Sequence, residues 1–368
     1  MLESNIYKGK TVLITGHTGF KGSWLSIWLT RLGARVVGAS IDIVSEPSNF
    51  SASKVERILD DRRVDITDLN SVKSLLLEVQ PDFIFHLAAQ SLVRLSYSKP
   101  IETMQINAIG SANILEASRL VDRKVVVIMI TSDKAYDNVE WVWGYRETDR
   151  LGGKDPYSAS KGMAEIVIRS YVESFLNKPS SKVRVGIARA GNVIGGGDWA
   201  VDRLLPDCME AWANEEVVDV RNPYATRPWQ HVLEPLSGYL LLAKNLYSDK
   251  QYCGEAYNFG PSSDDNYSVK KLIDEMSKHW SNIKWNDVSD RPERLHEAGL
   301  LKLNCDKALH DLGWKSALQF GDTVAFTVDW YKEFYKNRDQ SMYDFTVNQI
   351  ETYMQISSSL KNSRTSDG

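Results

Sequence analysis

The sequence predicts an α/β protein built on a doubly wound, mostly parallel sheet, with a smaller mixed α/β lobe toward the C-terminus. Short apolar runs, such as residues 10–16, 82–89 and 125–132, alternate with segments of helical periodicity. Strands that are apolar along their whole length indicate a sheet covered by helices on both faces. Because 43% of the 368 residues are hydrophobic and 25% are charged, the composition excludes a disordered, collagen-like or coiled-coil chain.

The elements are expected in a regular order along the chain. Six strands are predicted at 10–16, 34–42, 62–68, 82–89, 125–132 and 183–193, and four helices at 20–32, 69–79, 102–120 and 157–176. After residue 192 the predicted elements become shorter, and Gly, Pro, Trp and Arg become frequent. We therefore predict a first domain over 1–192, a second lobe over 193–355 that is interleaved with the first, and a polar, disordered tail over 356–368.

Charge and cysteine content restrict the partners and the compartment. The 44 basic and 48 acidic residues give a net charge of −4, which favours neither nucleic acid nor an anionic membrane as a partner. Three distant cysteines without a CxxC pair predict neither disulfides nor a structural metal site, and they fit a reducing compartment. The N-terminus has no apolar signal core, and no apolar run is long enough to span a membrane. We expect a cytoplasmic enzyme without a metal ion.

Three glycines directly after the first strand, Gly16, Gly19 and Gly22, form a GxxGxxG motif that opens a helix. This arrangement is typical of a Rossmann dinucleotide site, where the backbone approaches a diphosphate at the helix N-terminus. Asp42 and Ser40, near the end of the second strand, are placed to bind the adenosine ribose, and Asp65-Ile66 to meet adenine. Since no arginine follows Asp42 closely, NAD is favoured over NADP. The same glycines also occur in plain turns, and Asp42 in a plain loop.

Two further motifs carry acid–base chemistry. Tyr157 and Lys161 form YxxxK, which places both side chains on one face of a helix. A nearby ammonium group, together with the nicotinamide cation, is expected to lower the tyrosine pKa, so that the phenol can accept a proton from a sugar hydroxyl. Ser132, Asp133 and Lys134 follow the fifth strand, at the edge of the sheet where ligands bind. A surface helix and a turn cluster are the alternatives for these motifs.

These segments resemble the extended short-chain dehydrogenase/reductase family, also called the NAD-dependent epimerase/dehydratase family. The similarity lies in TGHTGFKG, DITD, HLAAQSLV, TSDKAYDN, YSASK, RAGNVIGGGDW and RPWQHVLEPLSGYL, and it covers nearly the whole chain. The resemblance implies NAD as cofactor. It assigns cofactor binding to Gly16, Thr18, Gly19, Phe20, Lys21, Gly22, Ser40, Asp42, Asp65, Ile66, Leu87, Ala88, Ala89, Asn107, Thr131, Tyr157, Lys161 and Arg189.

Within this family the long strings are most similar to nucleotide-sugar 4,6-dehydratases, with CDP-glucose as the implied substrate. The resemblance implies that Tyr157, aided by Ser132 and Lys161, takes the C4 hydroxyl proton during oxidation of C4. Lys134, where relatives carry Glu, would then take the C5 proton, and Asp133 would protonate the departing C6 hydroxyl. The product, CDP-4-dehydro-6-deoxy-D-glucose, would feed deoxysugar synthesis for surface polysaccharide. A homodimer or homotetramer, formed through the helices at 102–120 and 157–176, is also implied.

The second lobe supplies candidates for the nucleotide diphosphate. Arginine pairs well with phosphate oxygens. Trp199 and Trp229 can stack on a sugar or a base, although filling the core is an equal alternative. The predicted substrate-binding residues are Gln90, Ser91, Asn192, Arg203, Arg221, Arg227, Arg291 and Arg294.

Two other functions remain compatible with the sequence. One is another reaction on the same fold, a nucleotide-sugar 4-epimerase or a 4,6-dehydratase for another nucleotide; an epimerase needs Tyr157 and Lys161 but not the Asp133-Lys134 pair. The other is a catalytically silent NAD-binding regulator. The intact set of Ser132, Tyr157 and Lys161 argues against the regulator, because a protein that only binds NAD has no need of all three.

Overall fold

The fold is seen in a computed structural model, which describes residues 5–201, 203–262, 264–290 and 300–365. A seven-stranded sheet forms its centre, with the order β11-β6-β5-β4-β1-β2-β3, and every neighbouring pair is parallel. The strands are β1 (Thr11–Thr15), β2 (Arg35–Ser40), β3 (Asp60–Arg63), β4 (Phe83–His86), β5 (Val125–Ile130), β6 (Val183–Arg189) and β11 (Ala256–Asn258). The predicted doubly wound parallel sheet is confirmed.

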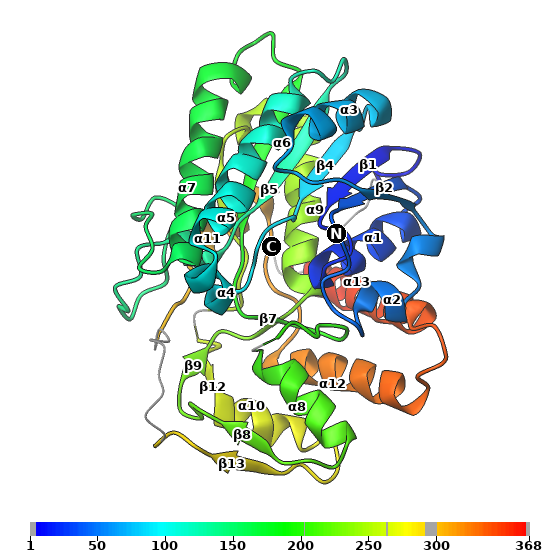
Figure 1. Cartoon of the computed structure of the whole chain (residues 1–368), viewed down its shortest axis with the longest axis vertical. Coiled ribbons are helices and arrows are strands. Elements are labelled where there is room, and N and C mark those ends of the chain that lie inside the picture. Colours follow the sequence, from blue (N-terminus) through cyan, green and yellow to red (C-terminus); the bar gives the residue numbers. More distant parts are fainter. Residues whose placement is uncertain (1–4, 202, 263, 291–299, 366–368) are drawn as a thin grey trace.

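Helices cover both faces of this sheet (Figure 1). Alternate residues of β1 point to opposite sides, since Val12 and Ile14 belong to one apolar core and Leu13 to the other. The Leu13 side is covered by α3 (Leu69–Val79), α6 (Gly110–Ser118) and α7 (Pro156–Tyr171). The Val12 side is covered by α1 (Phe20–Arg31), α9 (Leu233–Ser248) and α13 (Tyr343–Thr365). Burial on two faces explains why the strands read as continuous apolar runs.

The predicted helices are present with local changes. The segment predicted at 102–120 consists of α5 (Pro100–Met104), a π-helical segment η2 (Gln105–Ile109) and α6, and α7 continues into a second π-helical segment, η4 (Val172–Leu176). Short helices lie in the connections: α2 (Asn49–Ala52), η1 (Val55–Arg57), α4 (Val93–Ser98), η3 (Asp133–Ala135) and η5 (Lys250–Tyr252). Within the described residues, no helix is both long and apolar enough to cross a membrane.

A second lobe lies beyond the carboxyl ends of the strands, in the lower half of Figure 1. Three two-stranded pairs belong to it or link it to the sheet: β7 (Val193–Ile194) with β10 (Gln230–His231), β8 (Val218–Val220) with β13 (Trp285–Asp287), and β9 (Thr226–Arg227) with β12 (Tyr267–Ser268). The helices of this part are α8 (Leu204–Ala213), α10 (Val269–Met276) and α12 (Phe320–Lys336), whereas α11 (Asp306–Leu312) contacts α9 and β11 beside the main sheet. The lobe therefore faces the edge of the sheet where a ligand is expected.

The chain passes between the two parts more than once. After β7 it returns to the sheet as α9, which contacts β5 and β6, and β11 then extends the sheet beside β6. The predicted tail at 356–368 is wrong as far as Thr365, because α13 continues to that residue and residues 366–368 lie outside the described part. Tyr353 in this helix packs edge-on against Trp28, with ring centroids 5.8 Å apart. The helix is thus packed on α1 before residue 356, where the polar segment begins.

The third strand also differs from its predicted bounds. It was expected at 62–68, but β3 spans Asp60–Arg63 and is followed by a turn. The Asp65 carboxylate accepts hydrogen bonds from both the backbone N–H and the hydroxyl of Thr67, at 2.8 Å each. Such a turn, stabilised by an aspartate side chain, ends the strand.

Candidate active site

A cleft of about 850 Å³ opens at the carboxyl ends of the parallel strands. Ligands of doubly wound sheets bind at this edge. The walls come from the turns after β1, β2, β4 and β5, from α7, and from residues 190–195, 197–200 and 203–206. Most of the predicted site residues line it: Gly16, Thr18, Gly19, Phe20, Lys21, Gly22, Ser40, Asp42, Asp65, Ile66, Leu87, Ala88, Ala89, Gln90, Ser91, Thr131, Ser132, Asp133, Lys134, Tyr157, Lys161, Asn192 and Arg203.

The glycine-rich turn fits a diphosphate. A Cβ atom at Gly16 would lie 2.6 Å from the backbone nitrogen of Ala88, and one at Gly22 would lie 2.0 Å from the Gly16 carbonyl oxygen. Gly16 also has a φ of +77°, which side chains other than glycine rarely adopt. Gly19 precedes α1 and offers no capping side chain, so the first N–H groups of the helix face the cleft without a competing cap. This is the backbone arrangement that binds phosphate anions.

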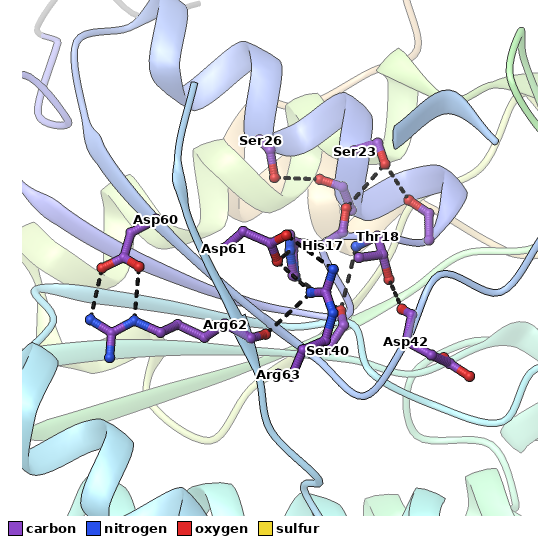
Figure 2. Close-up of polar contacts among 12 residues, drawn as sticks. His17, Thr18, Ser23, Ser26, Ser40, Asp42, Asp60, Asp61, Arg62 and Arg63 are labelled. Carbon is purple, nitrogen blue, oxygen red and sulfur yellow. Dashed lines mark hydrogen bonds and ion pairs between the residues drawn. The ribbon is translucent and has the colours of Figure 1, made fainter. Parts of the chain in front are cut away.

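A polar network centred on His17 holds the β2 end of the cleft (Figure 2). The fully buried His17 ring contacts Ser40 Oγ through Nδ1 at 2.9 Å and Asp61 Oδ1 through Nε2 at 2.8 Å. Thr18 donates its hydroxyl hydrogen to the Asp42 carbonyl at 2.7 Å, which leaves the Asp42 carboxylate pointing away from the network. The arrangement leaves that exposed carboxylate free to meet ribose hydroxyls.

His17 itself is not a ligand candidate from this geometry. Burial lowers its pKa below the usual value, although Asp61 opposes the shift. A Cβ atom at Gly38 would lie 2.3 Å from the imidazole, so only glycine on β2 leaves room for the ring. The histidine therefore fixes the turn after β1 against the end of β2.

The turn after β5 brings an acid into the cleft. The Ser132 hydroxyl donates a hydrogen bond to Asp133 Oδ1 at 2.9 Å and accepts one from the Lys134 N–H at 3.2 Å. Asp133 is buried, and a Cβ atom at residue 191 would lie 1.9 Å from its Oδ2. Gly191 therefore makes the space that this carboxyl group occupies.

Helix α7 presents the tyrosine and the lysine to the same place. The Asp155 carboxylate caps the helix by accepting the Ser158 N–H at 2.9 Å, and Pro156 occupies the first turn. Tyr157 and Lys161 follow one turn apart, both buried, with the ammonium nitrogen 6.0 Å from the centre of the phenol ring. The helix start thus fixes both side chains against the turn after β5.

The protein's own groups place the pKa of Tyr157 above its usual value. Burial raises the pKa of Tyr157 to about 12, and its hydrogen bond with Ser132 offsets only part of that effect. Burial also lowers the pKa of Lys161 to about 8, against the opposing charge of Glu165. Desolvation outweighs the nearby charges for both groups because neither is exposed to water.

Several positively charged side chains lie near Asp133 in the cleft. Burial and the charges of Arg203 and Lys161 lower the pKa of Lys21 to about 8, while Asp133 and Asp198 raise it. Arg203 forms an ion pair with Asp198 at 2.6 Å. A cleft lined by these cations suits an anionic ligand such as a diphosphate.

The histidines of the described residues do not form a metal site. His86 is buried, with Nδ1 2.7 Å from Thr15 Oγ1 and Nε2 3.2 Å from Ser111 Oγ, and His231 is buried in the core. Across the described part of the chain, no cluster of three His, Cys, Asp or Glu side chains is placed to hold a metal ion. His296 lies outside the described residues.

Residues 13–327 match the GDP-mannose 4,6 dehydratase family. The chain belongs to this family. The CDP-glucose 4,6-dehydratase of Salmonella typhimurium is 45% identical over 358 residues, which cover 96% of this chain and 99% of that protein. The dTDP-glucose 4,6-dehydratase of Haemophilus influenzae is 28% identical over 346 residues, 87% of this chain and 97% of its own length.

Solved structures show the same family fold. A dTDP-glucose 4,6-dehydratase from Streptomyces venezuelae, with NAD bound, matches with a TM-score of 0.71 and 22% identity over 88% of this chain and 97% of its own. A UDP-glucose 4-epimerase from Stenotrophomonas maltophila, also with NAD, matches with a TM-score of 0.76 and 21% identity over 89% and 99%. At such identities the likeness shows the fold alone.

Two predicted cofactor residues of this dehydratase-family chain do not line the cleft. Arg189 is fully buried and binds both carboxylate oxygens of Glu165, at 2.7 and 2.6 Å, and the Tyr136 hydroxyl at 2.7 Å. Asn107 is also buried and donates to Ser160 Oγ at 2.8 Å and to the Gln90 carbonyl at 3.0 Å. Neither side chain is part of the cleft lining, and their assignment as cofactor contacts stays a prediction.

The predicted arginines are distributed unevenly. Arg203 lines the cleft, but Arg221 and Arg227 do not, and Arg291 and Arg294 lie outside the described residues. Arg227 instead donates to the Thr226 carbonyl at 2.9 Å. Trp199 and Trp229 both line the cleft, and Trp199 also packs in an aromatic core with Trp330, Tyr331 and Phe334.

The sequence did not predict two residues that hold the cleft segments in place, Glu165 and His17. Glu165 receives Arg189 and also accepts a hydrogen bond from the Thr131 hydroxyl at 2.6 Å, so it ties α7 to the ends of β5 and β6. Its position four residues after Lys161 places it on the same face of α7, which is the signal that the sequence offered. His17 lies inside the glycine motif, but nothing in the sequence pairs it with Gly38 or Asp61.

Proposed function

We propose that this protein is a nucleotide-sugar 4,6-dehydratase that converts CDP-D-glucose to CDP-4-dehydro-6-deoxy-D-glucose. The 45% identical relative named for this activity supports the substrate. The observation that carries the reaction type is the buried Asp133 carboxyl group in one cleft with Tyr157 and Lys161. Loss of water requires an acid beside C6, because hydroxide is a poor leaving group, whereas a 4-epimerase needs no such acid.

NAD is proposed as the resident cofactor. The backbone around Gly16 and Gly22 and the first turn of α1 would hold its diphosphate, and the Asp42 carboxylate its adenosine ribose. When bound, NAD supplies a hydride acceptor and donor and a positive charge that favours ionised Tyr157. The NAD-bound relatives named above support this assignment by analogy of fold.

The chain's own residues divide the proton transfers. Tyr157 takes the C4 hydroxyl proton, with the Ser132 hydroxyl holding the oxygen in place and Lys161 adding positive charge. Lys134 takes the C5 proton once C4 has become a ketone. Asp133 gives its proton to the C6 hydroxyl, which leaves as water. The order of these steps follows from acidity, since only the ketone makes C5–H acidic enough to remove.

We also propose that the protein works in the cytoplasm as a homodimer or homotetramer. The outer face of α7 and η4 carries exposed apolar side chains, including Ile166 at 61% and Phe175 at 43% exposure. Contacts between two copies would cover this face, where α6 and α7 lie side by side. The product is proposed to serve deoxysugar synthesis for surface polysaccharide.

Mass spectrometry of product mixtures tests the proposal. The protein is incubated with NAD and, separately, with CDP-glucose, dTDP-glucose, UDP-glucose and GDP-mannose. We expect a product lighter by one water, formed fastest from CDP-glucose. A product of unchanged mass would indicate an epimerase, faster turnover of another nucleotide sugar would overturn the base specificity, and NAD binding without turnover would indicate a regulator.

A further inference from the structure

A small cavity lies against Asp133, beside the main cleft. Its volume is about 10 Å³, enough for the centre of one water molecule, and it is lined by residues that include Asp133, Gly191, Gln230, Gly260, Ser262 and Leu303. Asp133 and Gly191 border both spaces, whereas Gln230 borders only the small one. The lining runs from the buried acid and glutamine to the exposed Ser262.

Gln230 is the notable member of this lining. It is 2% exposed, and its amide nitrogen donates to two carbonyls, those of Gly191 and Phe259, at 2.9 Å each. These two bonds fix the orientation of the amide, since a carbonyl oxygen in that place would face two other carbonyl oxygens. Its own oxygen, Oε1, is buried without a hydrogen-bond partner among the described residues. A buried acceptor without a partner is costly, and a bound water is the usual remedy.

We propose that this cavity holds an internal water that bridges Gln230 Oε1 and the Asp133 carboxyl group, and that this water returns a proton to Asp133 after each turnover. The second part rests on the proposed dehydration. A water that donates one hydrogen to Oε1 keeps its lone pairs and its second hydrogen for Asp133. It can therefore bind the acid in the protonated and in the ionised form. Gln230 is then a positioning residue, which acts through the water.

The proton balance of the reaction explains why such a route is needed. In each turnover Tyr157 gains the C4 hydroxyl proton, the C5 proton is taken and given back, and Asp133 loses a proton to the departing water. The enzyme thus ends with Tyr157 one proton richer and Asp133 one proton poorer. Tyr157 releases its proton to solvent. The cavity water passes a proton to Asp133 and takes another from solvent, so that no net charge remains.

Removing the water's acceptor tests the kinetic part. Gln230→Leu is compared with Gln349→Leu, because Gln349 is also a buried glutamine whose nitrogen donates to a carbonyl, that of Phe326 at 2.7 Å, and whose oxygen has no partner among the described residues. Gln349 lies in α13, away from the cleft lining. In rapid-quench experiments, Gln230→Leu should complete the first turnover at the normal rate. Its later turnovers should be about tenfold slower, the loss expected for one ordinary hydrogen bond.

Three results would overturn the proposal. They are steady-state turnover of Gln230→Leu equal to that of Gln349→Leu, a first turnover slowed as much as the later ones, or a high-resolution crystal structure of the unmodified protein with no water between Gln230 Oε1 and Asp133. The crystal structure decides the question even if Gln230→Leu does not fold. Failure of the proposed function is distinguishable, because the unmodified protein would then form no dehydrated product.

Discussion

The Ser132 hydroxyl donates its hydrogen to Asp133 Oδ1 at 2.9 Å, and Ser132 also lowers the pKa of the buried Tyr157 phenol against the larger effect of burial. One short side chain therefore links the group proposed to act as base at C4 with the group proposed to act as acid at C6. Oxidation at C4 and loss of water from C6 can be separated by single substitutions, because each step depends on a different side chain.

Replacing Tyr157 with Phe removes the phenol oxygen and leaves the ring. We expect turnover to fall by about 10²–10⁴-fold, the usual contribution of a positioned acid–base group. Reduction of the cofactor in the presence of CDP-glucose, followed by the absorbance of NADH, should disappear with it. NAD binding, measured by calorimetry, should remain, and normal turnover would refute the role of Tyr157.

Replacing Asp133 with Asn keeps the shape and the acceptor for Ser132 but removes the transferable proton. Oxidation at C4 should continue, so reduced cofactor should accumulate, while release of dehydrated product falls by about 10²–10⁴-fold. Stopped-flow absorbance and quenched-product analysis measure the two quantities separately. Unchanged dehydration would show that another group is the acid.

Replacing Arg189 with Met should destabilise the fold without touching the cleft lining. The substitution leaves Glu165 buried and unpaired, which costs about 3–5 kcal/mol in the free energy of unfolding. The double variant Arg189→Met with Glu165→Leu should recover much of that loss, because no buried charge remains. Denaturant unfolding checks both, and a single variant as stable as the parent would contradict the structural role.

Glu234 makes stability depend on pH. Burial raises its pKa to about 7, although the N–H groups of Ala317 and Leu318 and the Tyr353 hydroxyl donate to it and oppose the shift. Because this folded-state pKa lies above the unfolded value, the folded protein binds the extra proton. The protonated Glu234 carboxyl group therefore stabilises the folded protein fully below about pH 4.5, and this contribution to the free energy of unfolding is lost as pH rises through about 7.

Replacing Glu234 with Gln should remove this dependence. At pH 8 we expect the variant to be more stable than the parent by an amount on the order of 3 kcal/mol, since a pKa unit is worth about 1.4 kcal/mol. Tyr353 can then donate to Ser237 Oγ, which already lies 2.9 Å away. Melting temperatures at pH 5 and pH 8 check this. If the melting temperature changed equally with pH in the parent and the variant, the prediction would be contradicted.

Sequence reasoning predicted the fold well where the signal is local. The helix expected at 69–79 matches α3, whose Asp68 carboxylate caps its first turn, and the apolar strands identified the sheet. It does not reveal contacts between distant segments. The family resemblance assigns Asn107 and Arg189 to the cofactor, whereas in the structure their side chains are hydrogen-bonded to Ser160 and Glu165. Likewise, α13 packs against α1, and its polar sequence does not reveal this contact.

The return of α9 and β11 to the main sheet has a consequence for dissecting the protein. A fragment that ended at residue 192 would leave β6 as an open sheet edge and would uncover the apolar surface under α9. Open edges of this kind invite pairing between separate molecules, and the fragment would aggregate. The parts before and after residue 192 therefore cannot be exchanged between relatives by a single cut, because the chain returns to the main sheet after that residue.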